Sequence, residues 1–105
     1  MNTRVVNIRT DPYDVYIGRP GRGRTGLFGN PYPVYVKCSR CGELHTTPSS
    51  TLPCFRAYFE ERVQSDSTFR LHALRLEGKT LGCYCKTGNP CHGQVIIEWI
   101  ERNAS

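Results

Sequence analysis

The sequence predicts a small α/β domain, a Rossmann-like sandwich with a partly parallel sheet. The predicted elements follow one another in the order strand, strand, loop, helix, helix, strand, helix, and strands separated by helices favour parallel pairing. The 105 residues, of which 38% are hydrophobic, suffice for one modest core. A turn-rich segment at about 37–54 carries a Cys-x-x-Cys motif of the zinc-knuckle type. We therefore expect a single domain over 1–105 with a zinc-binding insertion at about 37–54.

Three stretches have the composition of strands. Residues 4–9 have a β-branched centre, residues 14–17 follow the turn at Asp11-Pro12, and residues 79–85 lead into a loop before the last helix. We expect the stretch 79–85 to be a buried central strand. Residues 34–37 are also strand-like.

Three helices are predicted from apolar side chains that recur every three or four residues. Thr51 can cap the first helix, a break at 65–67 begins the second, and Gly78 ends it after about Leu76. The last helix is expected from Pro90 to about Arg102. The side chains expected in the core are Phe55, Tyr58, Phe59 and Val63, then Phe69, Ala73 and Leu76, and finally Val95, Ile96, Trp99 and Ile100.

The chain is basic, with a formal net charge of +5. Arg19, Arg22 and Arg24 lie in one long loop at 18–33 that is rich in glycine and proline. Long loops in compact domains are commonly functional, and glycine lets a backbone approach a ligand closely. The loop matches neither a Walker A motif nor a G-x-G-x-x-G fingerprint. A basic surface of this kind indicates an anionic partner, either nucleic acid or a small phosphate-bearing molecule, or simply a solvated face.

Six cysteines occur without an N-terminal apolar segment of the secretory type. This combination favours a reducing cytoplasm, with metal-bound or reactive thiols rather than a disulfide framework. No apolar run approaches about 18 residues, so no membrane span is expected.

A metal site is predicted in the insertion. Cys38 and Cys41 have the spacing of a CxxC-G knuckle, and His45 and Cys54 complete the pattern C-x2-C-x3-H-x8-C. Zinc at these four residues would supply folding free energy that a segment with few apolar side chains lacks. A thiol from the corner at 81–92 is the alternative to His45 as fourth ligand, and a hairpin with exposed free thiols is the alternative to a metal site.

The stretch 81–92, LGCYCKTGNPCH, predicts the end of a strand, a tight loop and the start of a helix. Cys83 and Cys85 fall on one face of the strand, and Asn89 is a plausible N-cap. Ligands bind at such corners, because helix N-termini carry orphan N–H groups and a partial positive charge. A thiol at a helix start is also expected to ionise readily.

The candidate ligand-binding and catalytic residues follow from this corner. Lys86 and the N–H groups near Gly93 would receive an anion, and Gly29 and Asn30 would shape the pocket, with Asn30 bonding to a base or sugar. In an enzyme, Cys91 or Cys85 would be the nucleophile and His92 the acid or base. A second metal site at these thiols is an alternative, and a local hydrogen bond is the alternative role for His92.

The chain resembles, almost end to end, an uncharacterised domain family carried by bacteria and bacteriophages. The resemblance rests on the VVNIR strand at 5–9, the YIGRP…GNP segments at 16–20 and 29–31, and the C-aromatic-C-K…P-C-H-G segment at 83–96. Gln94 stands where the family usually has an acidic residue, which would impair this member if that carboxylate were a catalytic base. The resemblance implies a small Rossmann-like fold and no established reaction.

The residues and the resemblance together favour a zinc-stabilised protein that binds, or also processes, a small nucleotide-like anion in the cytoplasm. Binding without turnover would make it a sponge or a sensor. The alternative is a zinc-dependent nucleic-acid-binding protein, in which the arginine loop contacts phosphates. A third possibility is a protein-interaction module that uses the insertion as its contact surface.

Overall fold

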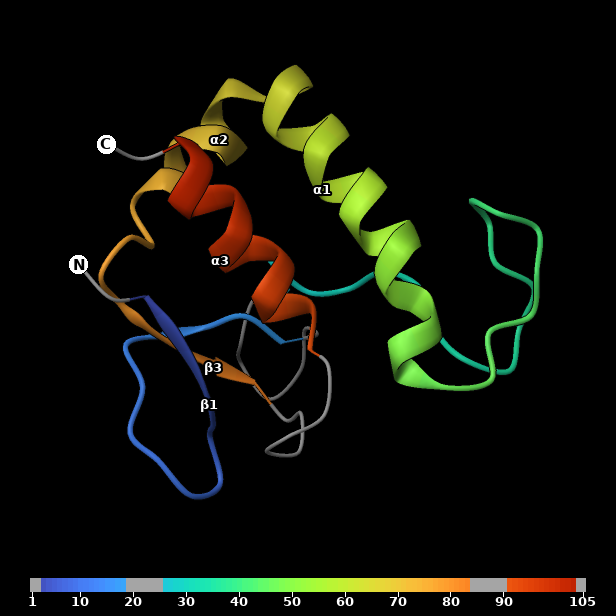
Figure 1. Ribbon diagram of the computed structural model, residues 1–105, viewed down its shortest axis with the longest axis horizontal. Helices are drawn as coiled ribbons and strands as arrows, with labels where there is room; N and C mark the ends of the chain where they lie inside the picture. Colours follow the sequence, from blue (N-terminus) through green and yellow to red (C-terminus); the bar gives the residue numbers. More distant parts are fainter. Residues whose placement is uncertain (1–2, 19–25, 84–90, 104–105) are drawn as a thin grey trace.

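The computed structural model describes residues 3–18, 26–83 and 91–103 (Figure 1). Their elements follow the predicted order and confirm a mixed α/β fold. They are β1 (Arg4–Asn7), β2 (Val15–Tyr16), a 3-10 helix (Pro48–Thr51), α1 (Leu52–Ser65), α2 (Ser67–Leu74), β3 (Thr80–Cys83) and α3 (His92–Asn103). Several predicted residues lie outside the described residues, namely Arg19, Arg22, Arg24, Cys85, Lys86, Asn89 and Pro90.

The sheet has the order β1-β3-β2, and β3 pairs in parallel with both neighbours. The prediction that residues 79–85 form the central strand is confirmed for the described part. The strand expected at 34–37 is wrong, because this segment forms only an isolated antiparallel bridge between Lys37 and Leu44. Tyr35 has a φ of 64°, which is incompatible with a continuous extended strand.

The connection from β1 to β2 crosses the sheet at Gly82. It covers only residues 8–14, although parallel strands usually need a longer crossover. Ile8 N–H donates to the Cys83 carbonyl at 3.1 Å and Asp14 N–H donates to the Thr80 carbonyl at 2.8 Å, so the connection runs back along β3. A Cβ atom on Gly82 would lie 2.5 Å from Ile8 and 2.6 Å from Tyr13. The short crossover therefore depends on glycine in the central strand.

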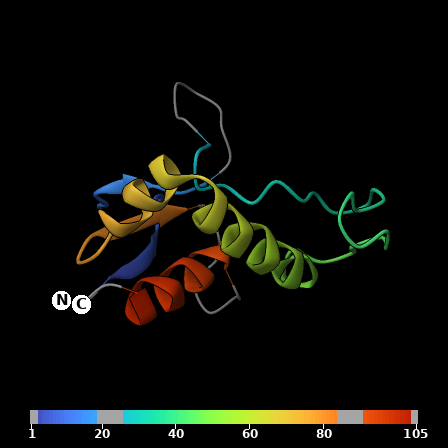
Figure 2. The ribbon, with the colours of Figure 1, turned by 90° about the horizontal axis from the view of Figure 1, so that it is seen from above.

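The helices pack on one another and cover one main core (Figures 1 and 2). The predicted core is confirmed except at Tyr58, which is only partly buried and whose hydroxyl accepts a hydrogen bond from Arg62 at 2.7 Å. The confirmed core residues are Phe55, Phe59, Val63, Phe69, Ala73, Leu76, Val95, Ile96, Trp99 and Ile100. In both views the insertion lies beside the N-terminal end of α1, away from the sheet.

Helix ends match the predictions only in part. Asp66 caps α2 by accepting from Phe69 N–H at 3.0 Å, and Gly78 has a φ of 78° in the turn that follows. Thr51 precedes α1, but its side chain does not cap the helix. Instead Thr47 caps the 3-10 helix. Among the described helices, none combines the length and the apolar character needed to cross a lipid bilayer.

Gly82→Ala is expected to lower the free energy of unfolding by about 1–3 kcal/mol, because the added methyl group overpacks against Ile8 and Tyr13. Urea denaturation measures this change. Adding Ile8→Ala to the variant should restore part of the loss, because it removes one of the two clashes. Strictly additive losses in the double variant would contradict the close crossover.

Candidate metal centre and strand-helix corner

Four potential metal ligands meet in the insertion, as the sequence predicts. The ligand atoms of Cys38, Cys41, His45 and Cys54 all lie within 4.8 Å of one another and could hold a metal ion. The sulfurs of Cys38 and Cys54 are 3.7 Å apart, and His45 Nε2 lies 3.6 Å from the sulfurs of both Cys41 and Cys54. His45 therefore takes the fourth place in this group, ahead of any described thiol of the corner.

The turn at 38–42 directs backbone N–H groups at the sulfurs. Arg40 N–H donates to Cys38 Sγ and Glu43 N–H donates to Cys41 Sγ, both at 3.4 Å. Gly42 has a φ of 79°, and its N–H donates to the Cys38 carbonyl at 3.0 Å. The left-handed conformation explains the glycine after the second cysteine.

Ionisation of the thiols is biased by these surroundings. The pKa of Cys38 is lowered to about 6, chiefly by a hydrogen bond from the backbone N–H of Cys41 and against the effect of burial. The pKa of Cys54 is raised to about 11, first because burial disfavours its charged form and then because the other thiols lie close to it. These surroundings thus favour the thiolate form at Cys38 and the protonated form at Cys54.

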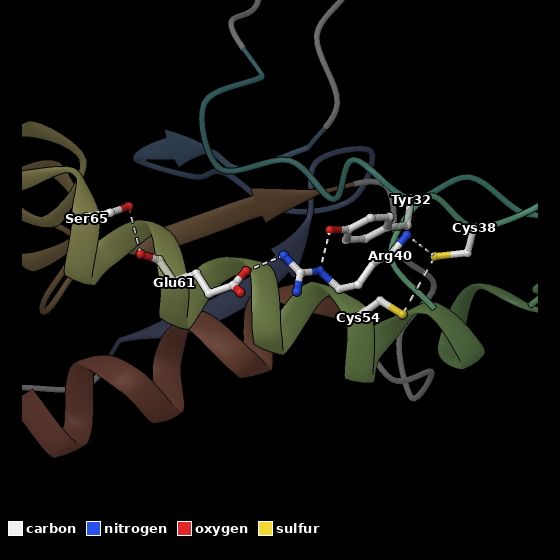
Figure 3. A network of polar contacts seen from close by, with 6 residues as sticks. All are labelled: Tyr32, Cys38, Arg40, Cys54, Glu61 and Ser65. Atoms are coloured by element: carbon white, nitrogen blue, oxygen red, sulfur yellow. Dashed lines mark hydrogen bonds and ion pairs between the residues drawn. The ribbon is translucent and has the colours of Figure 1, made fainter. Parts of the chain in front are cut away.

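Arg40 ties the cysteine turn to α1 (Figure 3). Its backbone N–H contacts Cys38 Sγ, its Nε donates to the Tyr32 hydroxyl at 2.8 Å, and its Nη2 forms an ion pair with Glu61. The Glu61 hydrogen bond is also the main reason that the pKa of Arg40 is raised. Sequence reasoning missed this role, because the partners lie 8 and 21 residues away and share no motif with the cysteines.

A second group of polar side chains occupies the corner between the ends of β2 and β3 and the start of α3. His92 is buried, and its Nε2 lies 2.7 Å from the Ile17 carbonyl oxygen. A carbonyl only accepts hydrogen bonds, so Nε2 carries a proton and Nδ1 faces Cys91 Sγ at 3.7 Å. The bond of Nε2 is a long-range contact to the residue after β2 rather than a local one at the helix start, and it leaves Nδ1 directed at a thiol.

Cys91 directly precedes α3 and contacts three polar groups. Its sulfur accepts from Gly93 N–H at 3.4 Å and lies 3.3 Å from the sulfur of Cys83. Cys91 and Cys83 are 5% and 1% exposed, respectively. The structure thus brings together the predicted Cys91, His92 and Gly93, together with Cys83.

Three predicted ligand-binding residues have structural contacts. A Cβ atom on Gly93 would lie 2.5 Å from Val5 and 2.9 Å from Ile17, so this glycine lets α3 approach the sheet. Asn30 accepts from Tyr32 N–H at 2.9 Å and donates to Thr51 Oγ1 at 2.7 Å. Gly29 is buried, and its N–H donates to the Gly26 carbonyl at 3.0 Å. Asn30 and Gly29 therefore order the chain that leads to the insertion.

The metal cluster and the corner meet at the first turn of α1. Cys54 belongs to the cluster, while the next residue, Phe55, packs its ring edge-on against the His92 ring at a centroid distance of 5.2 Å. Successive helical residues point about 100° apart, so one helical turn faces both sites.

These features define a small α/β protein with a Cys3His cluster beside a buried Cys-His corner. Comparison with protein-family models places residues 2–102 in the family described as "Domain of unknown function (DUF4326)". The chain belongs to this family, which confirms the predicted membership of an uncharacterised domain family. Searches of curated proteins and of solved structures found no match.

The four-ligand cluster predicts that the purified protein contains about one metal ion per chain. Cys38→Ser should remove the ion and lower the free energy of unfolding by about 4 kcal/mol or more, as expected for loss of a structural metal. Elemental analysis and thermal unfolding measure the two effects. Cys91→Ser is the matched control and should keep its metal; a metal-free wild-type protein that unfolds at the same temperature as Cys38→Ser would contradict the site.

Metal affinity is expected to fall as the pH falls. Because Cys54 keeps its proton up to about pH 11, an ion must displace this proton at neutral pH, and below about pH 6 it must also displace one from Cys38. The logarithm of the affinity should therefore fall more steeply below about pH 6. Competition with a chelator of known affinity across this range measures the slope, and a constant slope through pH 6 would contradict the lowered pKa of Cys38.

Proposed function

We propose that the protein is a zinc-stabilised binder of a small nucleotide-like anion, which it holds at the strand-helix corner of a Rossmann-like domain. The observation that carries the proposal is the meeting of the carboxyl ends of β2 and β3 with the N-terminus of α3. The bond from His92 to the Ile17 carbonyl, at 2.7 Å, joins the first residue of α3 to the residue that follows β2. Parallel α/β sheets bind ligands outside the carboxyl ends of their strands.

Zinc is the metal that best fits the cluster. Three thiols and one imidazole are a common donor set for structural zinc, and softer ligands of this type disfavour magnesium and calcium. Bonds of about 2.3 Å to sulfur and about 2.0 Å to nitrogen give tetrahedral edges of about 3.8 Å between sulfurs and about 3.5 Å from sulfur to nitrogen. The separations of 3.7 Å and 3.6 Å in the cluster agree with these edges. The ion would hold the insertion against α1 and take no part in chemistry.

Basic residues that adjoin the corner in the sequence favour an anionic ligand. Arg19 follows Gly18 at the end of β2, and Lys86 lies in the segment between Cys83 and Cys91. Arg22 and Arg24 follow in the same stretch of sequence. We propose that the arginines at 19, 22 and 24 and the lysine at 86 supply the phosphate contacts, with the helix dipole of α3 adding to them.

The corner also contains a nucleophile-base pair suited to processing such a ligand. Cys91 Sγ faces His92 Nδ1, and the Ile17 carbonyl holds the imidazole in the tautomer that leaves Nδ1 able to accept the thiol proton. The proposed reaction class is transfer or cleavage at the ligand through Cys91, with His92 returning the proton to the leaving group.

A thermal-shift screen against nucleotides, NAD-derived molecules and short oligonucleotides, at two salt concentrations, tests the binding proposal. A mononucleotide-sized ligand should raise the unfolding temperature with a weak salt dependence. Arg19→Ala is expected to lower the affinity at least about tenfold, in line with the loss of a charge-assisted contact to phosphate, without changing the metal content. Arg56→Ala removes the same charge from an exposed ion pair between Arg56 on α1 and Glu98 on α3, and this variant should bind as the wild type does.

Stabilisation by oligonucleotides alone, with a steep loss of affinity as salt is added, would favour the nucleic-acid-binding alternative. Equal affinity of the Arg19→Ala variant and the wild type would show that the ligand lies elsewhere.

A further inference from the structure

The two buried cysteines of the corner bring their sulfurs into direct contact. Their sulfurs are 3.3 Å apart, one on the last residue of β3 and the other at the residue that begins the turn into α3. Among residues 3–18, 26–83 and 91–103, the only group of three or more potential ligands is the Cys3His cluster, and it contains neither of them. Neither cysteine forms a disulfide in the structure.

The surroundings of Cys91 stabilise a thiolate at that sulfur. Gly93 N–H donates to it from the first turn of a 12-residue helix, whose N-terminus favours negative charge. His92 Nδ1 lies 3.7 Å away and can take up the thiol proton, because the Ile17 carbonyl engages the other ring nitrogen. Cys83 has no corresponding helix start and is almost fully buried in the main core.

We propose that Cys83 and Cys91 form a thiol-disulfide couple that reacts with hydroperoxides. This inference does not depend on the proposed ligand. The Cys91 thiolate attacks one oxygen of the peroxide, the O–O bond breaks, and the product is a sulfenic acid at Cys91 together with an alcohol or water. The proton taken up by His92 goes to the leaving oxygen.

The Cys83 sulfur then attacks the sulfur of the sulfenic acid. A bond forms between the two sulfurs, and the S–O bond breaks to release hydroxide, which takes the Cys83 proton and leaves as water. Two thiols and one hydroperoxide thus give one disulfide, one alcohol (or water) and one further water. The separation of 3.3 Å allows the second step with a small movement of the side chains.

Cys85 is the alternative to Cys83 as the disulfide partner of Cys91, and the cleavage sites in the sequence allow the two disulfides to be distinguished. Trypsin cleaves after Lys86, which separates Cys91 from the other two thiols, and chymotrypsin cleaves after Tyr84, which separates Cys83 from Cys85. The metal-loaded protein is treated with hydrogen peroxide, its remaining thiols are alkylated, and the digests are analysed by mass spectrometry. The expected product is a disulfide between the peptides that contain Cys83 and Cys91, with the metal retained.

Variants test the two roles separately. Cys85→Ser should still form the bond, whereas Cys83→Ser should stop at a sulfenic acid on Cys91, detected by dimedone. His92→Gln keeps a side-chain N–H for the Ile17 carbonyl and lacks Nδ1, so it should form the disulfide at least about tenfold more slowly. A disulfide between Cys85 and Cys91, or two alkylated thiols at Cys83 and Cys91 in the oxidised wild-type protein, would overturn the proposal.

Discussion

The first turn of α1 is the constraint on which the rest of the structure depends. Cys54 belongs to the metal cluster, Phe55 packs on His92, and Thr51, just before the helix, receives the Asn30 amide. A helix can face both sites only if its start is fixed in position and in rotation. Four ligands around one ion would provide this, because each bond to the metal restricts the side chain that makes it. Folding of the insertion and the orientation of His92 are therefore linked through two consecutive residues.

The insertion needs this constraint because its own apolar contacts are few. Its buried cluster consists of Tyr32 and two of the cysteines, with Tyr58 packed against it, and Tyr35 is 72% exposed. Burial of so small a cluster does not offset the conformational entropy of ordering the segment. The Arg40 contacts to Glu61 and Tyr32 orient the cysteine turn on α1 more than they stabilise it, because the Glu61 side chain is largely exposed. Metal binding is thus the main free energy that can hold this segment against α1.

The features that depend on short-range spacing could be predicted from the sequence. Apolar periodicity located α1, α2 and α3, and the spacing of Cys38, Cys41, His45 and Cys54 identified a cluster that the structure assembles. The sequence was insufficient where distant residues meet. The strand expected at 34–37 fails because Tyr35 adopts a positive φ. The Arg40 contacts join three separate segments, and the Asn30 amide bonds to Thr51, 21 residues away. Gly82 and Gly93 have a backbone-packing role that only the three-dimensional contacts reveal.

Two pairs of thiols among the described residues have similar separations but different surroundings. Cys38 and Cys54 are 3.7 Å apart and have a third thiol and an imidazole beside them, so a metal can satisfy all four ligands at once. Cys83 and Cys91 are 3.3 Å apart, and an imidazole nitrogen and a helix-start N–H face the Cys91 sulfur. These neighbours can take up the thiol proton and stabilise a thiolate, which favours the proposed reaction with the adjacent sulfur. The groups that face each thiol pair, more than the distance between the sulfurs, therefore distinguish the predicted metal site from the proposed redox couple.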